Sequence, residues 1–336
     1  MIKIELQEKT KMLDFHYNNI NYKKGREMTV VDFLNNRIKK NLLFIDLVGM
    51  YNFLIENIKK DSSGFSIIIA SPFELESFKK RFEARYGLLL DTTYKITTSG
   101  KIITYRNDLL KIFYYEEYDK WQAYELAKKI GVNVCPYCNR IYTFVLGNDF
   151  NKGTRFEYDH FFNKSNFPYL ALSFYNLIPS CHVCNSNFKG KKEFDLNKNI
   201  HPYIEGFNNE IVFSIKPKNI NFINGSHSAY RIKLKKGNLS SWDNIKVKAA
   251  FENISTFQLT KLYNMHKDYV DEIIKKSIIY NQDYISSLYK TFEGTLFKNE
   301  DDVKRFVLGN YIDEKSYSKR PLSKLTADIS KELGLI

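Results

Sequence analysis

Four cysteines, arranged as two C-x2-C pairs, are the residues of this 336-residue chain with the most specific chemistry. Cys135 and Cys138 form the first pair, Cys181 and Cys184 form the second, and these are all the cysteines of the chain. Two such pairs supply the four thiolates of a tetrahedral Zn²⁺, which can hold together a small module with little core of its own. The chain start carries no apolar run of the kind that directs export, so disulfides are not expected. We therefore predict one structural zinc and a reducing, cytoplasmic location.

A second set of polar residues lies between the cysteine pairs or directly beside them. Asp159 and His160 are adjacent, Asn176 lies in the segment that follows, and Asn185 comes directly after the last cysteine. Hydrolysis of a phosphodiester needs a base that activates water and a cation that neutralises charge on the phosphate. A neutral histidine suits the first task near pH 7, and Asp and Asn oxygens suit a hard cation such as Mg²⁺ or Mn²⁺. The pattern therefore predicts metal-assisted phosphodiester hydrolysis.

Each residue of this second set also has a purely structural interpretation. His160 could be a packed core histidine, and Asp159 could serve only in an ion pair. Asn176 could cap a turn, and Asn185 could cap the start of a helix, because asparagine is a favoured N-cap. The occurrence of all four residues within the frame of the cysteine pairs favours the catalytic interpretation.

Two strands and a helix are expected around these residues. Residues 141–146 and 154–159 have strong β character and predict paired strands joined by a turn at 147–149. A loop containing Pro179 follows, and a short helix is predicted to begin near Cys184. On the second strand, Asp159 and His160 would point to different sides, because side chains alternate along a strand.

The two cysteine pairs, together with Asp159-His160, Asn176 and Asn185, resemble the HNH nucleases of the ββα-metal (His-Me finger) type that carry a zinc-binding pair on each side. The resemblance implies that His160 is the general base and that Asp159 and Asn185 ligate the catalytic Mg²⁺. It also implies that Asn176 organises the loop that orients the histidine. The third position of the family is often histidine, so Asn185 makes this chain an H-N-N variant. The expected products are a 5′-phosphate and a 3′-hydroxyl.

More loosely, three segments are similar to HNH proteins of bacterial anti-phage systems, including the ATPase-partnered Septu and retron types. The segments are residues 185–190, His201-Pro202 and residues 320–325. This resemblance implies a role in bacterial defence and an ATPase or other defence-system subunit as a partner. DNA is the expected substrate, from the habit of the family.

The first part of the chain, residues 1–115, is expected to be an α/β region, mostly helical, with no role that its residues predict. Apolar residues recur with helical spacing from 31 to 47, and residues 66–70 predict a short buried strand. Ser71 is expected to cap the next helix, with a proline in its first turn. Another helix is predicted over residues 118–130, leading to the first cysteine pair.

The rest of the chain divides into a zinc-stapled nuclease domain, residues 116–205, and a third region, residues 206–336. Alternating apolar and basic residues predict antiparallel strands over 211–215, 231–235 and 245–248. Helical spacing of apolar residues then predicts helices up to the C-terminus. The expected fold class is α+β, with an N-terminal helical region, a ββα-metal core and a C-terminal β-then-α region.

Basic residues outnumber acidic ones, with a formal net charge of +13 and an isoelectric point near 9.2, which favours a polyanionic partner such as nucleic acid. A solvated lysine-rich face is the alternative explanation for the basic strands. The candidate nucleic-acid contacts are Arg140, Lys189, Lys191, Lys192, Arg231, Lys233 and Lys235.

Two other function classes fit the same residues. The chain could be a non-catalytic, zinc-dependent module that only binds nucleic acid, in which case His160 would be dispensable. It could also be an RNase with the same site, because the sequence does not distinguish a reader of the 2′-hydroxyl. A membrane is not an expected partner, because no stretch reaches the roughly 18 consecutive apolar residues of a membrane span.

Overall fold

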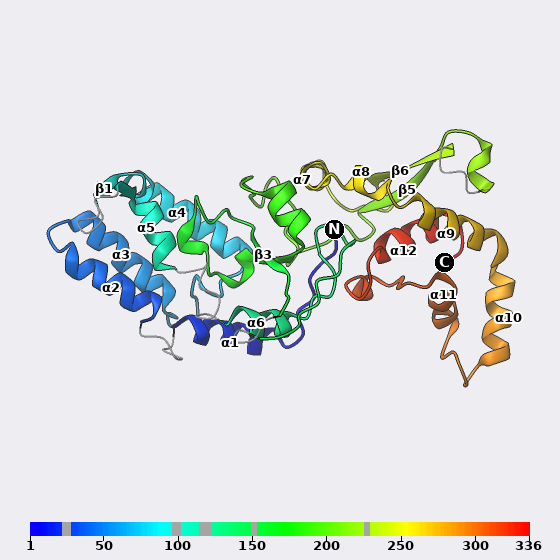
Figure 1. Cartoon of the computed structure of the whole chain (residues 1–336), viewed down its shortest axis with the longest axis horizontal. Helices are drawn as coiled ribbons and strands as arrows, with labels where there is room; N and C mark the ends of the chain where they lie inside the picture. The colour runs from blue at the N-terminus through cyan, green and yellow to red at the C-terminus, as the bar shows by residue number, and fades with distance from the viewer. Residues whose placement is uncertain (22–27, 96–101, 114–121, 149–152, 225–228) are drawn as a thin grey trace.

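Helices and short antiparallel sheets follow one another along the chain, and the computed structural model describes residues 1–21, 28–95, 102–113, 122–148, 153–224 and 229–336. Figure 1 shows an elongated molecule with N-terminal helices at one end, C-terminal helices at the other and β3 (Glu157–His160) between them. The strands of the described residues form three two-stranded antiparallel sheets. The predicted α+β class is therefore confirmed.

The N-terminal region is mostly helical in its described part. Its elements are α1 (Lys9–Asn21), α2 (Val30–Lys40), α3 (Ile45–Ile58), α4 (Pro72–Leu90), β1 (Thr93–Lys95), β2 (Ile102–Thr104) and α5 (Tyr105–Ile112). Ser71 caps α4 as predicted: its hydroxyl accepts from the amide of Glu74, and its own amide donates to the Glu74 carboxylate at 2.7 Å. The helix start could be predicted because a capping box uses only local residues.

The helical spacing over residues 31–47 is confirmed, but it belongs to two helices: the Asn41 side chain donates to the carbonyl of Arg37 where α2 ends, and α3 begins at Ile45. Another prediction for this region is wrong. Residues 66–70 form a buried turn and not a strand. The Ser66 hydroxyl donates to the carbonyl of Ile58, and the amide of Ala70 donates to the Ser66 carbonyl. Serine can satisfy backbone groups in this way without a neighbouring strand.

The central region consists of short elements joined by long loops. They are α6 (Ala123–Ile130), β3, the 3-10 turns η2 (Pro168–Leu170) and η3 (Phe174–Asn176), β4 (Leu177–Ser180) and the π-helix η4 (Val183–Lys189). The helix predicted over 118–130 begins at Ala123 within the described residues, and its first four predicted residues lie outside them. The short helix predicted near Cys184 is present as η4.

The predicted pairing of residues 141–146 with 154–159 is present only at its turn end, where Leu146 and Thr154 form an isolated antiparallel bridge. Beyond this bridge, β3 pairs with β4 instead, with Tyr158 opposite Pro179 and His160 opposite Leu177. The loop predicted at Pro179 is therefore a strand at this residue. β4 is an edge strand with one partner, where the missing N–H is tolerated.

The C-terminal region begins with a hairpin and continues as helices. Its elements are β5 (Ile211–Pro217), η5 (Ile220–Asn224), β6 (Tyr230–Lys236), α7 (Asn244–Thr256), α8 (Leu259–Tyr263), α9 (Lys267–Ile279), α10 (Gln282–Phe292), α11 (Glu300–Leu308), η7 (Glu314–Ser316) and α12 (Ser323–Glu332). The first two predicted strands are confirmed and pair antiparallel. The third, over 245–248, is wrong: Asp243 accepts from the amide of Lys246 at 2.8 Å and starts α7 there.

Both edges of the β5–β6 hairpin are closed by side chains. On β5, the amide of Phe213 donates to Asp328 and the amide of Ile215 donates to Glu332, both from α12. On β6, Asn264 bonds both the amide and the carbonyl of Ile232. These contacts satisfy edge groups that would otherwise be open to pairing with another chain.

One cluster of buried apolar side chains runs through all three predicted regions. The chain start helps to join them, because the amide of Ile2 donates to the carbonyl of Pro136 and the amide of Ile4 donates to that of Pro202. Gly206 lies so close to this segment that an added Cβ would fall 2.5 Å from the amide nitrogen of Lys3. The boundaries at residues 115 and 205 stay a prediction.

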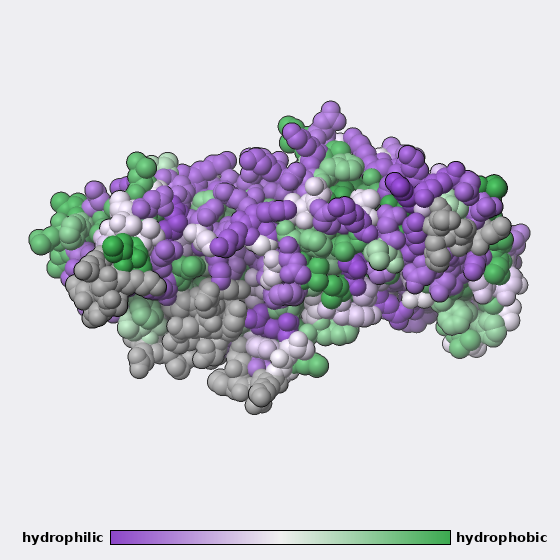
Figure 2. Space-filling model, turned by 45° about the horizontal axis from the view of Figure 1, so that its top comes forward, coloured by the Kyte–Doolittle hydropathy of each residue, from purple (hydrophilic) through white to green (hydrophobic). Residues whose placement is uncertain are grey.

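Hydrophilic side chains cover much of the face in Figure 2, and exposed apolar atoms gather at both ends of the molecule and in its middle. In the N-terminal region, the connection from α2 to the first residue of α3 exposes Leu42, Leu43, Phe44 and Ile45. Among the described residues, none of the helices combines the length and the apolar character needed to cross a membrane.

Candidate functional site

The four cysteines come together from two loops. Cys135 and Cys138 lie in a tight turn after α6, in which the amide of Asn139 donates to the carbonyl of Cys135 at 2.8 Å. Cys181 directly follows β4, and Cys184 lies in η4. All four are buried, and their sulfur atoms lie within 4.8 Å of one another.

This geometry suits a metal ion. The Sγ atoms of Cys138 and Cys181 are 4.0 Å apart. A tetrahedral zinc with Zn–S bonds of about 2.3 Å requires S···S distances of roughly 3.8 Å. Hydrogen bonds from Cys135, Cys138 and Cys184 lower the pKa of Cys181, whereas burial raises the pKa of Cys135. The four cysteines could therefore hold a metal ion such as zinc.

Asp159 lies on β3 and is held from two sides. Its Oδ2 atom accepts from the hydroxyl of Tyr137 at 2.6 Å, and its Oδ1 atom accepts from the ammonium of Lys189 at 2.9 Å. The side chains of Lys189 and Asp159 are only 1% and 3% exposed. Lys189 also donates to the carbonyl of His160 at 2.6 Å. The predicted surface contact Lys189 is therefore a buried partner of the candidate site in this structure.

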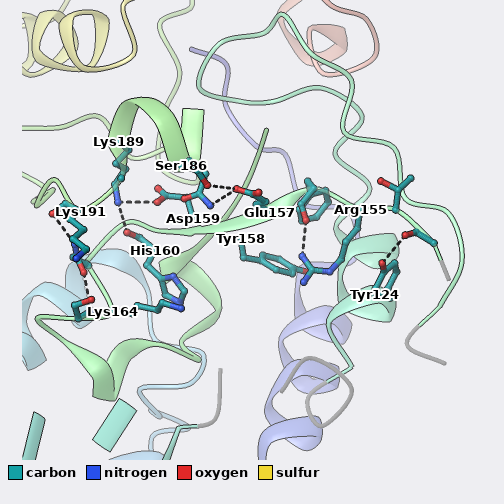
Figure 3. Close-up of a pocket in the computed structure, with 17 residues that line it drawn as sticks. Tyr124, Arg155, Glu157, Tyr158, Asp159, His160, Lys164, Ser186, Lys189 and Lys191 are labelled. Carbon is teal, nitrogen blue, oxygen red and sulfur yellow. Dashed lines mark hydrogen bonds and ion pairs between the residues drawn. The ribbon is translucent and has the colours of Figure 1, made fainter. Parts of the chain in front are cut away.

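His160 points to the other side of β3 from Asp159 (Figure 3). Its Nε2 atom lies 3.1 Å from the carbonyl oxygen of Ala171. A carbonyl can only accept, so Nε2 carries the proton and the lone pair of the neutral ring is on Nδ1. Burial, with the charges of Lys164 and Lys189, lowers the pKa of His160 well below its usual range. The imidazole is therefore neutral at pH 7, the state that a general base requires.

Asn176 is completely buried and clamps the loop between β3 and β4. Its Oδ1 atom accepts from the amide of Phe162 at 2.7 Å, and its Nδ2 atom donates to the carbonyls of Phe162 and Leu170. Leu170 precedes Ala171, whose carbonyl binds the His160 ring. Asn176 thus fixes the backbone at Phe162, two residues after His160, and the backbone next to Ala171, which binds the His160 ring.

Asn185 lies in the first turn of η4, and its amide group contacts Glu157, a residue for which the sequence predicts no role. Its Nδ2 atom donates to Oε2 of Glu157 at 2.7 Å, and Ser186 donates to the same oxygen. The other oxygen, Oε1, bonds the ring of His182 at 2.6 Å. Burial opposes ionisation of Glu157, but the hydrogen bonds from His182, Asn185 and Ser186 outweigh it and lower the pKa.

A cavity of about 650 Å³ joins these side chains. Asp159, His160 and Asn185 all line it, and Glu157 lies between Asp159 and the basic end of the cavity at Arg155 (Figure 3). Further lining residues with basic side chains are Lys164, Lys189 and Lys191. The cavity therefore combines carboxylates, a neutral histidine and cationic groups.

The remaining predicted nucleic-acid contacts are spread over the molecule. Arg140 donates to the ring of His266 at 2.9 Å, and Lys192 is exposed beside Lys191. The last three candidates lie on β6, which Figure 1 shows apart from β3. They are Arg231, Lys233 and Lys235, and the last forms an ion pair with Glu332 at 3.6 Å.

Two residues of this site could have been found from the sequence. Glu157 precedes Asp159 by two positions, so the alternation of a strand places both on one face. Tyr137 lies between the cysteines of the first pair, next to any metal they hold. The sequence does not reveal the residue that each of them contacts. Tyr137 bonds Asp159 and Glu157 bonds Asn185, and in both pairs the two residues are more than 20 positions apart in the chain.

The chain matches no protein-family model, and comparison with curated proteins and with solved structures finds no match either.

Proposed function

We propose that this chain is a metal-dependent endonuclease of the HNH type that hydrolyses phosphodiester bonds, with DNA as the preferred substrate. The observation that carries the proposal is the arrangement of neutral His160, Asp159 and Asn185 around one cavity. Asn176 supports it, because this residue holds the histidine's loop in the way the family resemblance implies.

In the proposed reaction, His160 accepts a proton from the water that attacks the phosphorus. The bond from phosphorus to the 3′-oxygen breaks, and the departing 3′-oxygen takes a proton from solvent, which leaves a 5′-phosphate and a 3′-hydroxyl. The Nδ1 atom of His160 carries the lone pair, and the bond from Nε2 to the carbonyl of Ala171 fixes the ring. A base positioned in this way contributes a factor of about 100 to 10,000 to the rate. The imidazole keeps its proton-accepting form in mildly acid solution because burial disfavours the imidazolium.

The second requirement is a cation, and the donor atoms at the cavity fit a hard one. Asp159 offers carboxylate oxygens, and the bond from Asn185 to Glu157 turns the amide oxygen of Asn185 away from that acid. Mg²⁺ or Mn²⁺ prefers such oxygen ligands and would neutralise charge on the phosphate. Both oxygens of Asp159 already have partners, the hydroxyl of Tyr137 and the ammonium of Lys189, so a cation bound there would share the carboxylate with Lys189.

The cysteine cluster serves as the scaffold of this site in the proposal, and Zn²⁺ fits its four thiolates. Asn185 directly follows Cys184, so the cluster fixes the start of η4. Arg155, Lys164 and Lys191 flank the acidic part of the cavity and would hold phosphates on either side of the scissile one. A defence role with an ATPase partner rests on the resemblance alone.

The test is cleavage of supercoiled plasmid and of a mixed RNA pool by the purified protein, with Mg²⁺ or Mn²⁺ and with EDTA. We expect metal-dependent cleavage of the plasmid that is lost in His160→Ala. Cleavage of RNA alone would keep the mechanism and overturn the choice of substrate. Binding of either nucleic acid without cleavage would favour the binding-only module.

A further inference from the structure

Tyr137 joins the cysteine cluster to the candidate site. It lies inside the first C-x2-C loop, it is fully buried, and its ring stacks on Phe257 with the centroids 4.3 Å apart. Its hydroxyl donates to Oδ2 of Asp159 at 2.6 Å, a short bond to a charged acceptor. Such a bond orients the carboxylate as well as satisfying the hydroxyl.

The backbone of this loop leaves the hydroxyl little freedom. The amide of Cys135 donates to the carbonyl of Ile141, and the amide of Asn139 donates to the carbonyl of Cys135. Both neighbours of the Pro136-Tyr137 dipeptide are cysteines of the cluster. A metal held by the four thiolates would therefore fix Tyr137 at both ends of its loop.

The second cysteine pair reaches the same carboxylate from the other side. Lys189 ends η4, the π-helix that contains Cys184, and its ammonium binds Oδ1 of Asp159. Each cysteine loop thus contributes one contact to one oxygen of Asp159. This arrangement is more specific than packing requires, since a backbone carbonyl satisfies a buried tyrosine equally well, as that of Cys138 does for Tyr263.

We propose that Tyr137 is a positioning residue, through which the cysteine cluster holds Asp159 in the orientation that binds the catalytic cation. The inference rests on the proposed function and adds to it a path from the structural metal to the reactive site. Loss of a comparable outer contact to a metal ligand typically lowers metal affinity or activity by about 10- to 100-fold.

The test compares Tyr137→Phe with Tyr230→Phe in the full chain. Tyr230 is a matched control, because it is also buried and donates to a carboxylate, Asp271, at 2.6 Å, outside the cavity. Three quantities are measured: zinc content by elemental analysis, Mn²⁺ affinity by electron paramagnetic resonance, and the Mg²⁺ concentration that gives half-maximal cleavage. For Tyr137→Phe we expect unchanged zinc, Mn²⁺ binding weaker by about tenfold or more, and a matching shift in the Mg²⁺ requirement. Tyr230→Phe should change none of the three.

A second comparison separates positioning from stability. The effect of Tyr137→Phe on Mn²⁺ affinity should vanish in an Asp159→Asn background, because the residue that it orients is then altered. Unchanged Mn²⁺ affinity in Tyr137→Phe, or loss of its zinc, would overturn the inference while the nuclease assignment stands. Wild-type protein that neither binds Mn²⁺ nor cleaves would overturn both.

Discussion

Two buried Lys–Asp ion pairs, one at the cavity and one in α12, have the same chemistry in different surroundings. Lys189 and Asp159 are 2.9 Å apart, and Lys324 and Asp328 are 2.8 Å apart, with each of the four side chains at most 6% exposed. The pair in α12 attaches this helix to β5 and to the segment before it. Asp328 accepts from the amide of Phe213, and Lys324 donates to the carbonyl of Asn208. The pair at the cavity connects η4, which contains Cys184, to β3, and Tyr137 from the first cysteine pair donates to the same carboxylate. A buried ion pair by itself therefore does not identify a site; its neighbours do.

Removal of the cysteine-bound metal should have the largest effect and should separate the two regions. A structural zinc contributes on the order of 10 kcal/mol to folding. We expect Cys181→Ser, or treatment with a strong chelator, to abolish the hydrogen-exchange protection of β3 and β4 before that of β5 and β6. Equal loss of protection in both sheets, or a protein without zinc by elemental analysis, would contradict this role of the cluster.

Asp159→Asn and Asp328→Asn should destabilise the protein to a similar degree. Each change leaves a buried lysine without its charged partner, which costs about 3–5 kcal/mol. Only Asp159→Asn should abolish metal-dependent cleavage and weaken Mn²⁺ binding when both variants are compared at a temperature where they are folded. Denaturant unfolding measures the loss of stability, and plasmid cleavage measures the loss of activity. Loss of cleavage in both variants would show that Asp159 has no role in cleavage beyond that of any buried ion pair.

Asn176→Ala should lower both stability and cleavage. Three buried hydrogen bonds to Phe162 and Leu170 are lost, which we expect to cost about 3 kcal/mol. Asn253 is a matched control, because it clamps the amide and the carbonyl of Ile200 in the same manner, away from the cavity. Asn253→Ala should reduce stability alone. Full cleavage by folded Asn176→Ala would show that the loop does not orient His160.

Stability should decrease in acid because two buried histidines outside the cavity are held neutral. Burial lowers the pKa of His16 to about 4 and that of His201 to about 3. Above pH 6.5 both are neutral in the folded and unfolded chain; below it the unfolded chain binds protons that the folded chain does not. Each histidine should therefore reduce the free energy of unfolding by about 1.4 kcal/mol per pH unit, down to pH 4 for His16 and pH 3 for His201. Denaturant unfolding between pH 5 and 7 measures the slope, which should become shallower in His201→Gln.

The smallest expected effects concern the basic surfaces. Lys191 lines the cavity and Arg231 lies on the exposed face of β6. We expect Lys191→Gln to weaken binding of DNA several-fold and to reduce the salt dependence by about one ion, because one phosphate contact is lost. Arg231→Gln should leave binding within error. Weaker binding by Arg231→Gln, with unchanged binding by Lys191→Gln, would place the nucleic acid on the β5–β6 hairpin.

The sequence was informative where an interaction is local. The cap at Ser71, the alternation in β5 and β6, and the two cysteine pairs all depend on neighbouring residues, and each was predicted. It was misleading where the partner is distant. Residues 141–146 have the composition of a strand but form only isolated bridges, whereas Pro179 lies in β4 because β3 is available. Lys189 resembles a surface lysine in the sequence, and only the folded chain brings it to Asp159.

The rate of plasmid cleavage in Mg²⁺ by His160→Ala and His201→Ala would show whether neutral His160 activates water in the cavity. His201 is also buried and bonds a backbone carbonyl, that of Tyr175, through Nε2, so its variant reports the cost of losing a packed imidazole. We predict that His160→Ala cleaves at least about 100-fold more slowly than the wild type. His201→Ala should cleave within a few-fold of it where both are folded. Equal rates for the wild type and His160→Ala would contradict the account.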